Sequence, residues 1–164
     1  LGQWTQSEKG KENWDLINAG KEAIDLKKGG AFFHHAESFG MMRGGHLDYC
    51  ILGAYQVSSN GDVANWHTGH PNAIPAAGGA MDLASGARNV YVMMEHLTRD
   101  GCSKILESCT YPLTGMNCVS RVYTEIATFD FSNGCVFVID IISPYDAEYV
   151  QSITEVPLDF SRLS

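Results

Sequence analysis

Residues 52–83 read LGAYQVSSNGDVANWHTGHPNAIPAAGGAMDL, and the rest of the chain is organised around this stretch. An apolar run leads into a segment rich in Gly and Asn, which ends at Gly78-Gly79 shortly before an acidic residue. This pattern is typical of a ligand loop in an α/β protein, because glycine lets main-chain N–H groups approach a substrate that a Cβ would keep away. On local composition alone, Asn60-Gly61 and Gly78-Gly79 also fit ordinary turns.

The composition bounds the class of protein. A chain of 164 residues with 45% hydrophobic residues is long enough for one domain or most of one. Its formal net charge of −8 argues against a nucleic-acid partner, since phosphate binding needs a basic surface. The start is polar without a signal-peptide pattern, and no apolar run reaches the length of a membrane span. We therefore expect a cytoplasmic protein without a membrane partner.

Apolar segments alternate with helical ones. The near-continuous apolar content of three segments is typical of strands in a parallel sheet covered on both faces; these are 49–57, 90–94 and 135–142. Three helices are expected between and after them, at 81–88, 104–109 and 146–155. The alternation indicates α/β layering. Near the start we expect a surface loop over 1–15, a short strand over 31–33 and one helical turn over 38–42.

The cysteines and histidines suggest neither disulfides nor metal. Five spread cysteines without a CxxC pair indicate reduced thiols, and we expect Cys50 and Cys135 to be buried and inert. Adjacent His34 and His35 would point to opposite faces of a strand and so could not share an ion. The pair at 67 and 70 lies in a loop without carboxylate or cysteine company. We therefore predict no metal site.

Two segments carry a resemblance to a known family. Asp62 to Trp66 (DVANW) and 78–83 (GGAMDL) resemble signature segments of the class I 3-oxoacid CoA-transferases, specifically the β (B) subunit. Further matches follow in the same order, over about residues 16 to 131: LINAGK at 16–21, MRGGHLD at 42–48, Glu95-His96 and PLTG at 112–115. The resemblance implies a layered, mostly parallel sheet flanked by helices, of the CoA-transferase and NagB-RpiA-like kind. Residues 1–164 would be the C-terminal portion of a single β-subunit domain, with its N-terminal strands missing.

The resemblance also implies a reaction. A class I enzyme moves CoA from succinyl-CoA to a 3-oxoacid, so CoA is a substrate and no further cofactor is expected. A glutamate carboxylate attacks the acyl-CoA and becomes a glutamyl-CoA thioester, which the acceptor acid then reverses in a ping-pong mechanism. Each attack forms a tetrahedral oxyanion that needs preorganised N–H donors. An α subunit would complete the enzyme, as an α2β2 assembly.

Several residues inherit roles from the matched motifs. The main-chain N–H of Gly79 would stabilise the oxyanion, while Gly78 and Ala80 would complete the turn against CoA. Lys21, placed by a turn at 18–20, would contact CoA, although a solvated lysine is the interpretation without the resemblance. We expect Asp82 to cap the following helix. Gln56, Asn65 and Glu95 are expected to line or brace the site.

One departure from the family pattern concerns the nucleophile. The family carries its glutamate in a Ser-Glu-Asn-Gly motif, which is absent from this sequence and is expected upstream of Leu1 or on another chain. Activity would then need that segment together with an α subunit. An acyl-CoA hydrolase on the same scaffold and a non-catalytic CoA-binding subunit remain alternatives, while a sugar-phosphate isomerase of similar fold fits the motifs less well.

The acid substrate is inferred from one tetrapeptide. WHTG at 66–69 resembles the branch of the family that acts on 3-oxoadipate more than the branch that acts on ketone bodies. His67 is the candidate to hold the distal carboxylate of such a dicarboxylic acid, because an imidazole offers a cation or an N–H donor.

Overall fold

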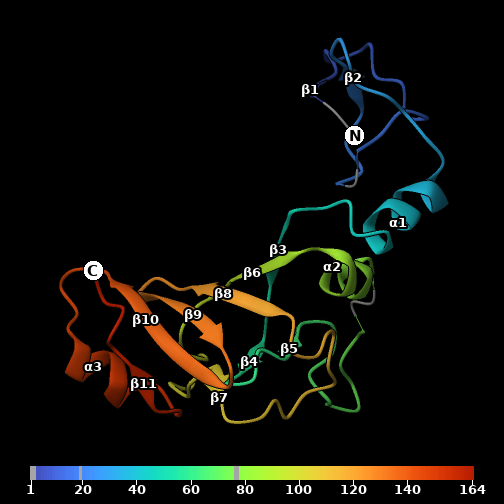
Figure 1. Cartoon of the computed structure of the whole chain (residues 1–164). Coiled ribbons are helices and arrows are strands. Elements are labelled where there is room, and N and C mark those ends of the chain that lie inside the picture. The colour runs from blue at the N-terminus through green and yellow to red at the C-terminus, as the bar shows by residue number, and fades with distance from the viewer. Residues whose placement is uncertain (1–2, 19, 76–77) are drawn as a thin grey trace. The chain divides into compact units, whose positions relative to one another are not determined.

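The computed structural model describes residues 3–18, 20–75 and 78–164. Their contacts divide the chain into two compact units, Leu1–Ser38 and Phe39–Ser164, which we describe separately (Figure 1). The expectation of one domain over residues 1–164 stays a prediction. Ala19 of the 16–21 motif and Ala76-Ala77 of the central stretch lie outside the described residues.

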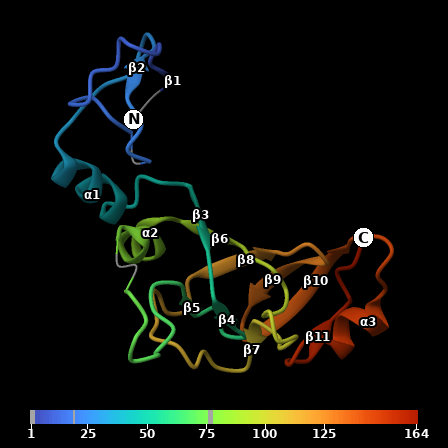
Figure 2. The same ribbon diagram turned by 180° about the vertical axis from the view of Figure 1, so that it is seen from behind.

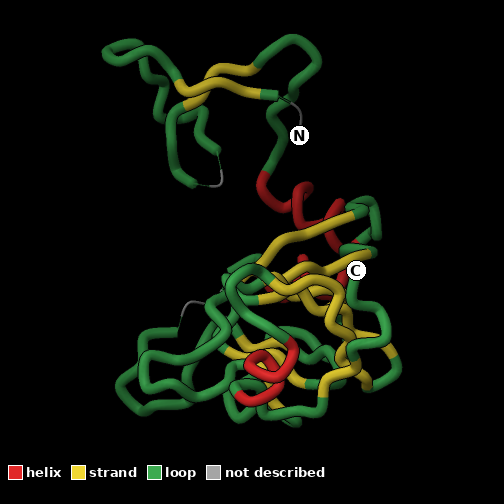
Figure 3. Tube along the Cα trace, turned by 90° about the vertical axis from the view of Figure 1, so that its left-hand side faces the viewer, coloured by secondary structure: helices red, strands yellow, loops and turns green. Residues whose placement is uncertain are grey.

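The first unit is built on a pair of short strands, drawn in yellow in Figure 3. β1 (Trp4–Gln6) pairs antiparallel with β2 (Ile24–Leu26). The expected loop over 1–15 is therefore wrong at β1, whose three side chains are exposed and form no apolar alternation. The expected strand over 31–33 is also wrong, because this segment has no strand structure and exposes Phe32 and Phe33.

Helix α1 (His35–Arg43) is longer than the single turn expected over 38–42. The Glu37 carboxylate accepts a hydrogen bond from the main-chain N–H of His34 at 3.1 Å, which satisfies a donor at the start of the helix. Arg43 lies in the last turn, where a cation interacts favourably with the free carbonyl groups. The local sequence thus supports both ends of a helix that apolar periodicity alone does not reveal.

A six-stranded mixed sheet forms the centre of the second unit, with the order β11-β10-β9-β8-β6-β3. Its strands are β3 (Tyr49–Gly53), β6 (Asn89–Met93), β8 (Val119–Tyr123), β9 (Ala127–Ser132), β10 (Cys135–Ile141) and β11 (Leu158–Asp159). Three of the five pairings are parallel, namely β3 with β6, β6 with β8, and β10 with β11. The hairpins β8–β9 and β9–β10 are antiparallel. Strands were therefore correctly expected near 49, 90 and 135.

The expected 49–57 strand is divided between two sheets. After β3, the chain bends at Ala54 and Tyr55 and enters a three-stranded sheet of order β5-β4-β7. Its strands are β4 (Gln56–Ser58), β5 (Val63–Ala64) and β7 (Ile105–Leu106). The helix expected over 104–109 is therefore wrong: Ile105 and Leu106 are both buried and pair parallel with β4. Two adjacent buried residues fit a short interior strand better than one helix face.

The large sheet buries one face within this unit. Cys50 and Leu52 of β3 point into the core, whereas Tyr49 and Ile51 are exposed by 60% and 64%. The expectation of a β3 covered on both faces is therefore wrong for the described residues. Tyr49 instead continues a row of rings across the open face, 5.3 Å from the Tyr91 ring on β6.

Two short helices confirm the expected helices near 81–88 and 146–155. α2 (Ala80–Gly86) lies beside β3, and α3 (Ala147–Ser152) lies with β11 next to β10 (Figures 1 and 2). The Asp146 carboxylate caps α3 by accepting the main-chain N–H of Tyr149 at 2.8 Å. None of the described helices is long and apolar enough to cross a membrane.

The core lies between the large sheet, the small sheet and both helices. Phe129 at the centre of β9 is its largest fully buried side chain, and α3 contributes the fully buried Val150. Cys50 is buried, as expected. Cys135 is exposed, so the expectation of a buried thiol is wrong there: it is the first residue of β10, directly after the turn at Gly134.

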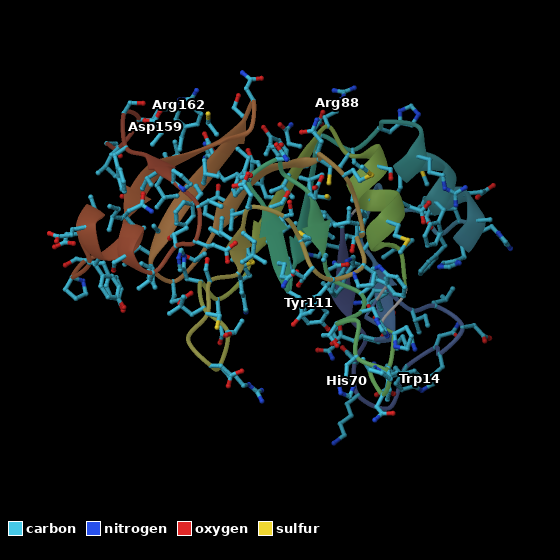
Figure 4. All side chains as sticks on the ribbon, turned by 90° about the horizontal axis from the view of Figure 1, so that it is seen from below. Trp14, His70, Arg88, Tyr111, Asp159 and Arg162 are labelled. Atoms are coloured by element: carbon cyan, nitrogen blue, oxygen red, sulfur yellow. The ribbon has the colours of Figure 1, made fainter. Side chains whose placement is uncertain are left out.

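The last residues fold back over β10. Arg162 lies with its guanidinium 3.6 Å from the centre of the Phe137 ring, and the main-chain N–H of Ser164 donates to the carbonyl of Ile139 at 3.2 Å. Figure 4 shows Asp159 and Arg162 close together at this end of the sheet. The hydrogen bonds to Ser161 hold the pKa of Asp159 below its usual value. The C-terminal segment thus belongs to the second unit.

Candidate active site

A cavity of about 470 Å³ opens where β3 and β6 end. The two strands run parallel and finish together, with Gly53 opposite Met93. Ligands of open α/β sheets bind outside the carboxyl ends of parallel strands, so the fold itself favours a site here. The described residues that line the cavity are Gly53, Ala54, Tyr55, Asn65, Met93, Met94, Glu95 and Lys104.

Asn65 is held firmly at the wall of this cavity. Its side-chain NH₂ donates to the carbonyl of Gly53 at 3.1 Å, and its side-chain oxygen accepts from the hydroxyl of Thr114 at 2.7 Å. The same hydroxyl accepts the main-chain N–H of Asn65 at 3.0 Å. The amide orientation is therefore fixed by the protein, and one of its two N–H bonds points away from the Gly53 contact.

Gln56 braces the loop that follows β7. Its side-chain oxygen accepts main-chain N–H bonds from Thr110 at 2.9 Å and Tyr111 at 3.1 Å. Tyr111 lies on this loop (Figure 4), and Trp66 also anchors it by donating its indole N–H to the carbonyl of Leu113 at 3.1 Å. Gln56 thus shapes the loop that carries Thr114, which in turn orients Asn65.

Lys104 is a cation that the sequence patterns did not single out. Its side chain is only 16% exposed, and its ammonium lies 3.8 Å from a carboxylate oxygen of Glu95, whose side chain is 78% exposed. The patterns missed it because residues 104–109 were expected to form a helix.

His96 follows Glu95 and is fully buried. Its Nε2 lies 2.9 Å from the Thr154 hydroxyl, which donates its own proton to the carbonyl of Val150 at 2.7 Å. The hydroxyl can therefore only accept from the imidazole, which assigns the proton to Nε2. His96 Nδ1 has no hydrogen-bond partner among the described residues.

We predict that His96 makes the protein sensitive to mild acid. Burial lowers the pKa of His96 below its usual 6.5, although the Glu125 carboxylate acts in the opposite direction. Below pH 6.5 the unfolded chain therefore binds a proton at this histidine before the folded chain does. The stability present above pH 6.5 is lost as the pH falls toward the lowered pKa, by up to about 1.4 kcal/mol per pH unit.

Urea unfolding between pH 5 and pH 7.5, compared with His96→Gln, measures this contribution. The variant should show a shallower loss of unfolding free energy on acidification, whatever its stability at neutral pH. His46→Gln is the control, because it changes an exposed histidine and should keep the slope of the unaltered protein. Equal slopes for the unaltered protein and His96→Gln would contradict the prediction.

The glycine pair lies at the start of α2, and it is not among the described residues that line the cavity. A Cβ on Gly78 would meet open space, whereas a Cβ on Gly79 would lie 3.3 Å from the Phe39 ring. Asp82 does not cap α2. It lies within the first turn of the helix, and the N-cap position is occupied by Gly79, which has no side chain to form a capping bond. The Asp82 carboxylate instead accepts from Arg43 at 2.5 Å. The expected Asp82 cap is therefore wrong.

His67 and Lys21 are each held by a local turn. His67 Nδ1 accepts the main-chain N–H of Gly69 at 2.9 Å, so a neutral ring carries its proton on Nε2. In the first unit, the main-chain N–H of Lys21 donates to the carbonyl of Asn18 at 3.0 Å, and Lys21 has a φ of 63°. Neither observation tests the role expected for its residue. Among the described residues, no group of three or more His, Cys, Asp or Glu side chains could hold a metal ion.

Comparison with solved structures defines the class of fold. The chain superposes on an acyl-CoA transferase from Escherichia coli with a TM-score of 0.72 and 17% identity, covering 90% of this chain and 32% of that one. It superposes on the glutaconate CoA-transferase from Acidaminococcus fermentans with a TM-score of 0.66 and 20% identity, covering 82% and 60%. The expected α/β CoA-transferase fold is confirmed, with a sheet that is mixed.

Sequence comparison then identifies the family. Residues 5–140 match the coenzyme A transferase family, and the chain belongs to it. It is 56% identical to the β (B) subunit of 3-oxoadipate CoA-transferase from Pseudomonas putida over 158 residues, covering 96% of this chain and 74% of that protein. It is 44% identical to the corresponding subunit of the probable succinyl-CoA:3-ketoacid coenzyme A transferase from Bacillus subtilis, covering 93% and 70%. The chain is therefore of the β-subunit type within the class I transferases.

Proposed function

We propose that this β subunit takes part in moving CoA from succinyl-CoA to 3-oxoadipate. The observation that carries the proposal is the 56% identity, over 96% of the chain, to a protein named for 3-oxoadipate CoA transfer. A relative named for succinyl-CoA and 3-ketoacids supports the donor and the wider class of acceptor. The proposal includes a partner α subunit, an α2β2 assembly and a cytoplasmic location.

The proposed chemistry keeps the energy of the thioester. A glutamate carboxylate attacks the acyl carbonyl and expels CoA thiolate, and the thiolate then attacks the glutamyl carbonyl of the anhydride and releases the acid. The acceptor acid repeats these steps in reverse. Since residues 1–164 contain no Ser-Glu-Asn-Gly segment, the proposal assigns the glutamate to a residue outside this sequence.

This chain would supply binding and an oxyanion contact. The main-chain N–H of Gly79 would stabilise the tetrahedral oxyanion, and Gly78 and Ala80 would lie against CoA. The open space at Gly78 supports this, because a ligand could approach its main chain closely. Lys21 would contact CoA, and the exposure of this residue leaves its ammonium within reach of a ligand. No cofactor beyond the CoA substrate enters these steps.

The full-length enzyme, assembled with its α subunit, tests the proposal directly. Succinyl-CoA and 3-oxoadipate should give 3-oxoadipyl-CoA and succinate, separated by chromatography and identified by mass. Incubation with succinyl-CoA alone should add the mass of a bound CoA to one polypeptide of the enzyme. Release of free CoA and succinate at the same rate without acceptor would favour the hydrolase instead, and no turnover of any thioester would favour a non-catalytic CoA-binding subunit.

We predict that His67→Met shifts the enzyme from 3-oxoadipate toward acetoacetate. The Nε2–H of His67 would donate to the distal carboxylate, and a bond to a charged group is worth about 1.5–3 kcal/mol. The ratio of kcat/KM values for the two acids should therefore fall by about tenfold or more. His70→Met is the matched control, since His70 lies in the same loop and its Nδ1 likewise accepts a local main-chain N–H, from Asn72. If His67→Met leaves the ratio of kcat/KM values unchanged, His67 does not hold the distal carboxylate.

A further inference from the structure

The side chain of Lys104 is mostly buried, and its ammonium has no close hydrogen-bond partner among the described residues. Its side chain is 16% exposed, and its one ionic partner among the described residues lies at 3.8 Å, beyond hydrogen-bond distance. An ammonium carries three N–H donors, and a charge removed from water costs free energy unless it is paired and hydrogen-bonded. Lys104 therefore has capacity for an anion that the described residues do not fill.

Glu95 does not fill that capacity. Its side chain is 78% exposed, so its carboxylate keeps most of its hydration. A pair of this kind, long and with one member in solvent, contributes little to stability. Lys104 lines the cavity, so its ammonium remains available to a ligand there.

The main chain around Lys104 is fixed on both sides. Its N–H donates to the carbonyl of His96 at 3.0 Å, and its carbonyl accepts from the N–H of Val57 on β4 at 3.0 Å. The bridge between Leu97 and Ser103 closes the loop before it. A charged group that is carried on such a rigid frame can bind a ligand without first losing backbone freedom.

The walls of the cavity suit a small organic acid. Ala54, Met93 and Met94 offer apolar surface, and Asn65 adds an amide whose orientation Thr114 fixes. A volume of about 470 Å³ is within the ordinary range for small-ligand sites, which combine apolar walls with a few placed polar groups. One cation and one amide beside apolar surface fit a carboxylate on a short carbon chain.

We propose that this cavity binds a carboxylate of the acid substrate, with Lys104 as its counter-ion and Asn65 as a second donor. The assignment rests on the proposed function for the identity of the acid. The carboxylate is either the one that all 3-oxoacids share or the distal one of a dicarboxylic acid, and both have the same chemistry.

Direct binding tests the site without relying on turnover. Succinate is titrated into the assembled full-length enzyme by calorimetry, for the unaltered protein, Lys104→Met and Lys104→Arg. Lys104→Met should weaken succinate binding by at least about tenfold, because it keeps the length of the side chain and removes the charge. Lys104→Arg should retain binding within a few-fold. Equal affinity in Lys104→Met and the unaltered enzyme would overturn the proposal.

Glu95→Gln separates a ligand site from a structural ion pair. If Lys104 serves the acid, removing the competing carboxylate should tighten succinate binding. If Lys104 serves only Glu95, Glu95→Gln should weaken succinate binding as Lys104→Met does, and that result would overturn the proposal. Free CoA should bind all these variants equally, and a parallel loss of CoA affinity would also count against the assignment.

Steady-state kinetics then tell which carboxylate is bound. A raised KM for both acetoacetate and 3-oxoadipate in Lys104→Met supports binding of the shared carboxylate. A raised KM for 3-oxoadipate alone supports binding of the distal one, and unchanged KM values for both overturn the proposal. If the enzyme transfers no CoA while succinate binding still depends on Lys104, the proposed function fails and the carboxylate site stands.

Discussion

Gly86→Ala should destabilise the second unit by about 3 kcal/mol or more, the upper range for forcing an added methyl group into packed structure. Gly86 is the last residue of α2, and a Cβ built there would overlap the carbonyl oxygen of Met42 and lie 2.6 Å from its carbonyl carbon. Both are main-chain atoms, so no side-chain rotation can relieve the contact. The end of α1 and the end of α2 would have to separate.

Gly40→Ala is the matched control because it makes the same chemical change in a helix, but there we expect the substitution to stabilise the protein. A Cβ on Gly40 of α1 would meet nothing within 4 Å, so only helix propensity changes, and alanine should add about 0.5–1 kcal/mol. Urea unfolding followed by fluorescence, with equal m-values, gives both differences. A Gly86→Ala protein as stable as the unaltered one would show that the two helix ends are not in contact.

The sequence predicted the fold where apolar residues run together. Cys50, Leu52, Val90 and Val92 mark β3 and β6 as strands with one side in the core, and the structure buries all four. The small sheet escaped prediction because β5 and β7 have two residues each, too short for a period of two to appear. β1 was not predicted because its side chains are exposed and show no apolar alternation. It is defined by its hydrogen bonds to β2, which lies far away in the sequence.

The candidate site was predicted only in part, and from matched motifs instead of apolar runs. Asn65 and Glu95 came from matched motifs, and both line the cavity at the strand ends. Lys104 could not be found from a motif, because its importance arises from burial and from the distance to Glu95, which only the fold creates. Asp82 shows the same limit. Its position in the sequence suits a helix cap, but in the structure its carboxylate pairs with Arg43 of α1.

Phe129→Ala should cost about 3–5 kcal/mol of unfolding free energy, the range for removing a fully buried aromatic ring. Phe129 lies at the centre of β9, opposite Val122 on β8 and Val138 on β10, both of which are fully buried. Its ring also lies 5.5 Å from the ring of His96. Substitution would thus leave a cavity bounded by three elements whose main chains are fixed by the sheet, so it could collapse only partly.

Phe131→Ala isolates the effect of burial from that of the residue type. Phe131 lies on the same strand and the same face, opposite Val136, but it is only partly buried at the margin of the core. Its truncation should cost less than half as much, because solvent and loop atoms can fill the space. Equal losses in the two variants would contradict the central place of Phe129 in the core. The Phe129 ring packs beside His96, and the His96 carbonyl accepts the main-chain N–H of Lys104. Removing the ring should therefore also loosen the frame that carries the proposed carboxylate site.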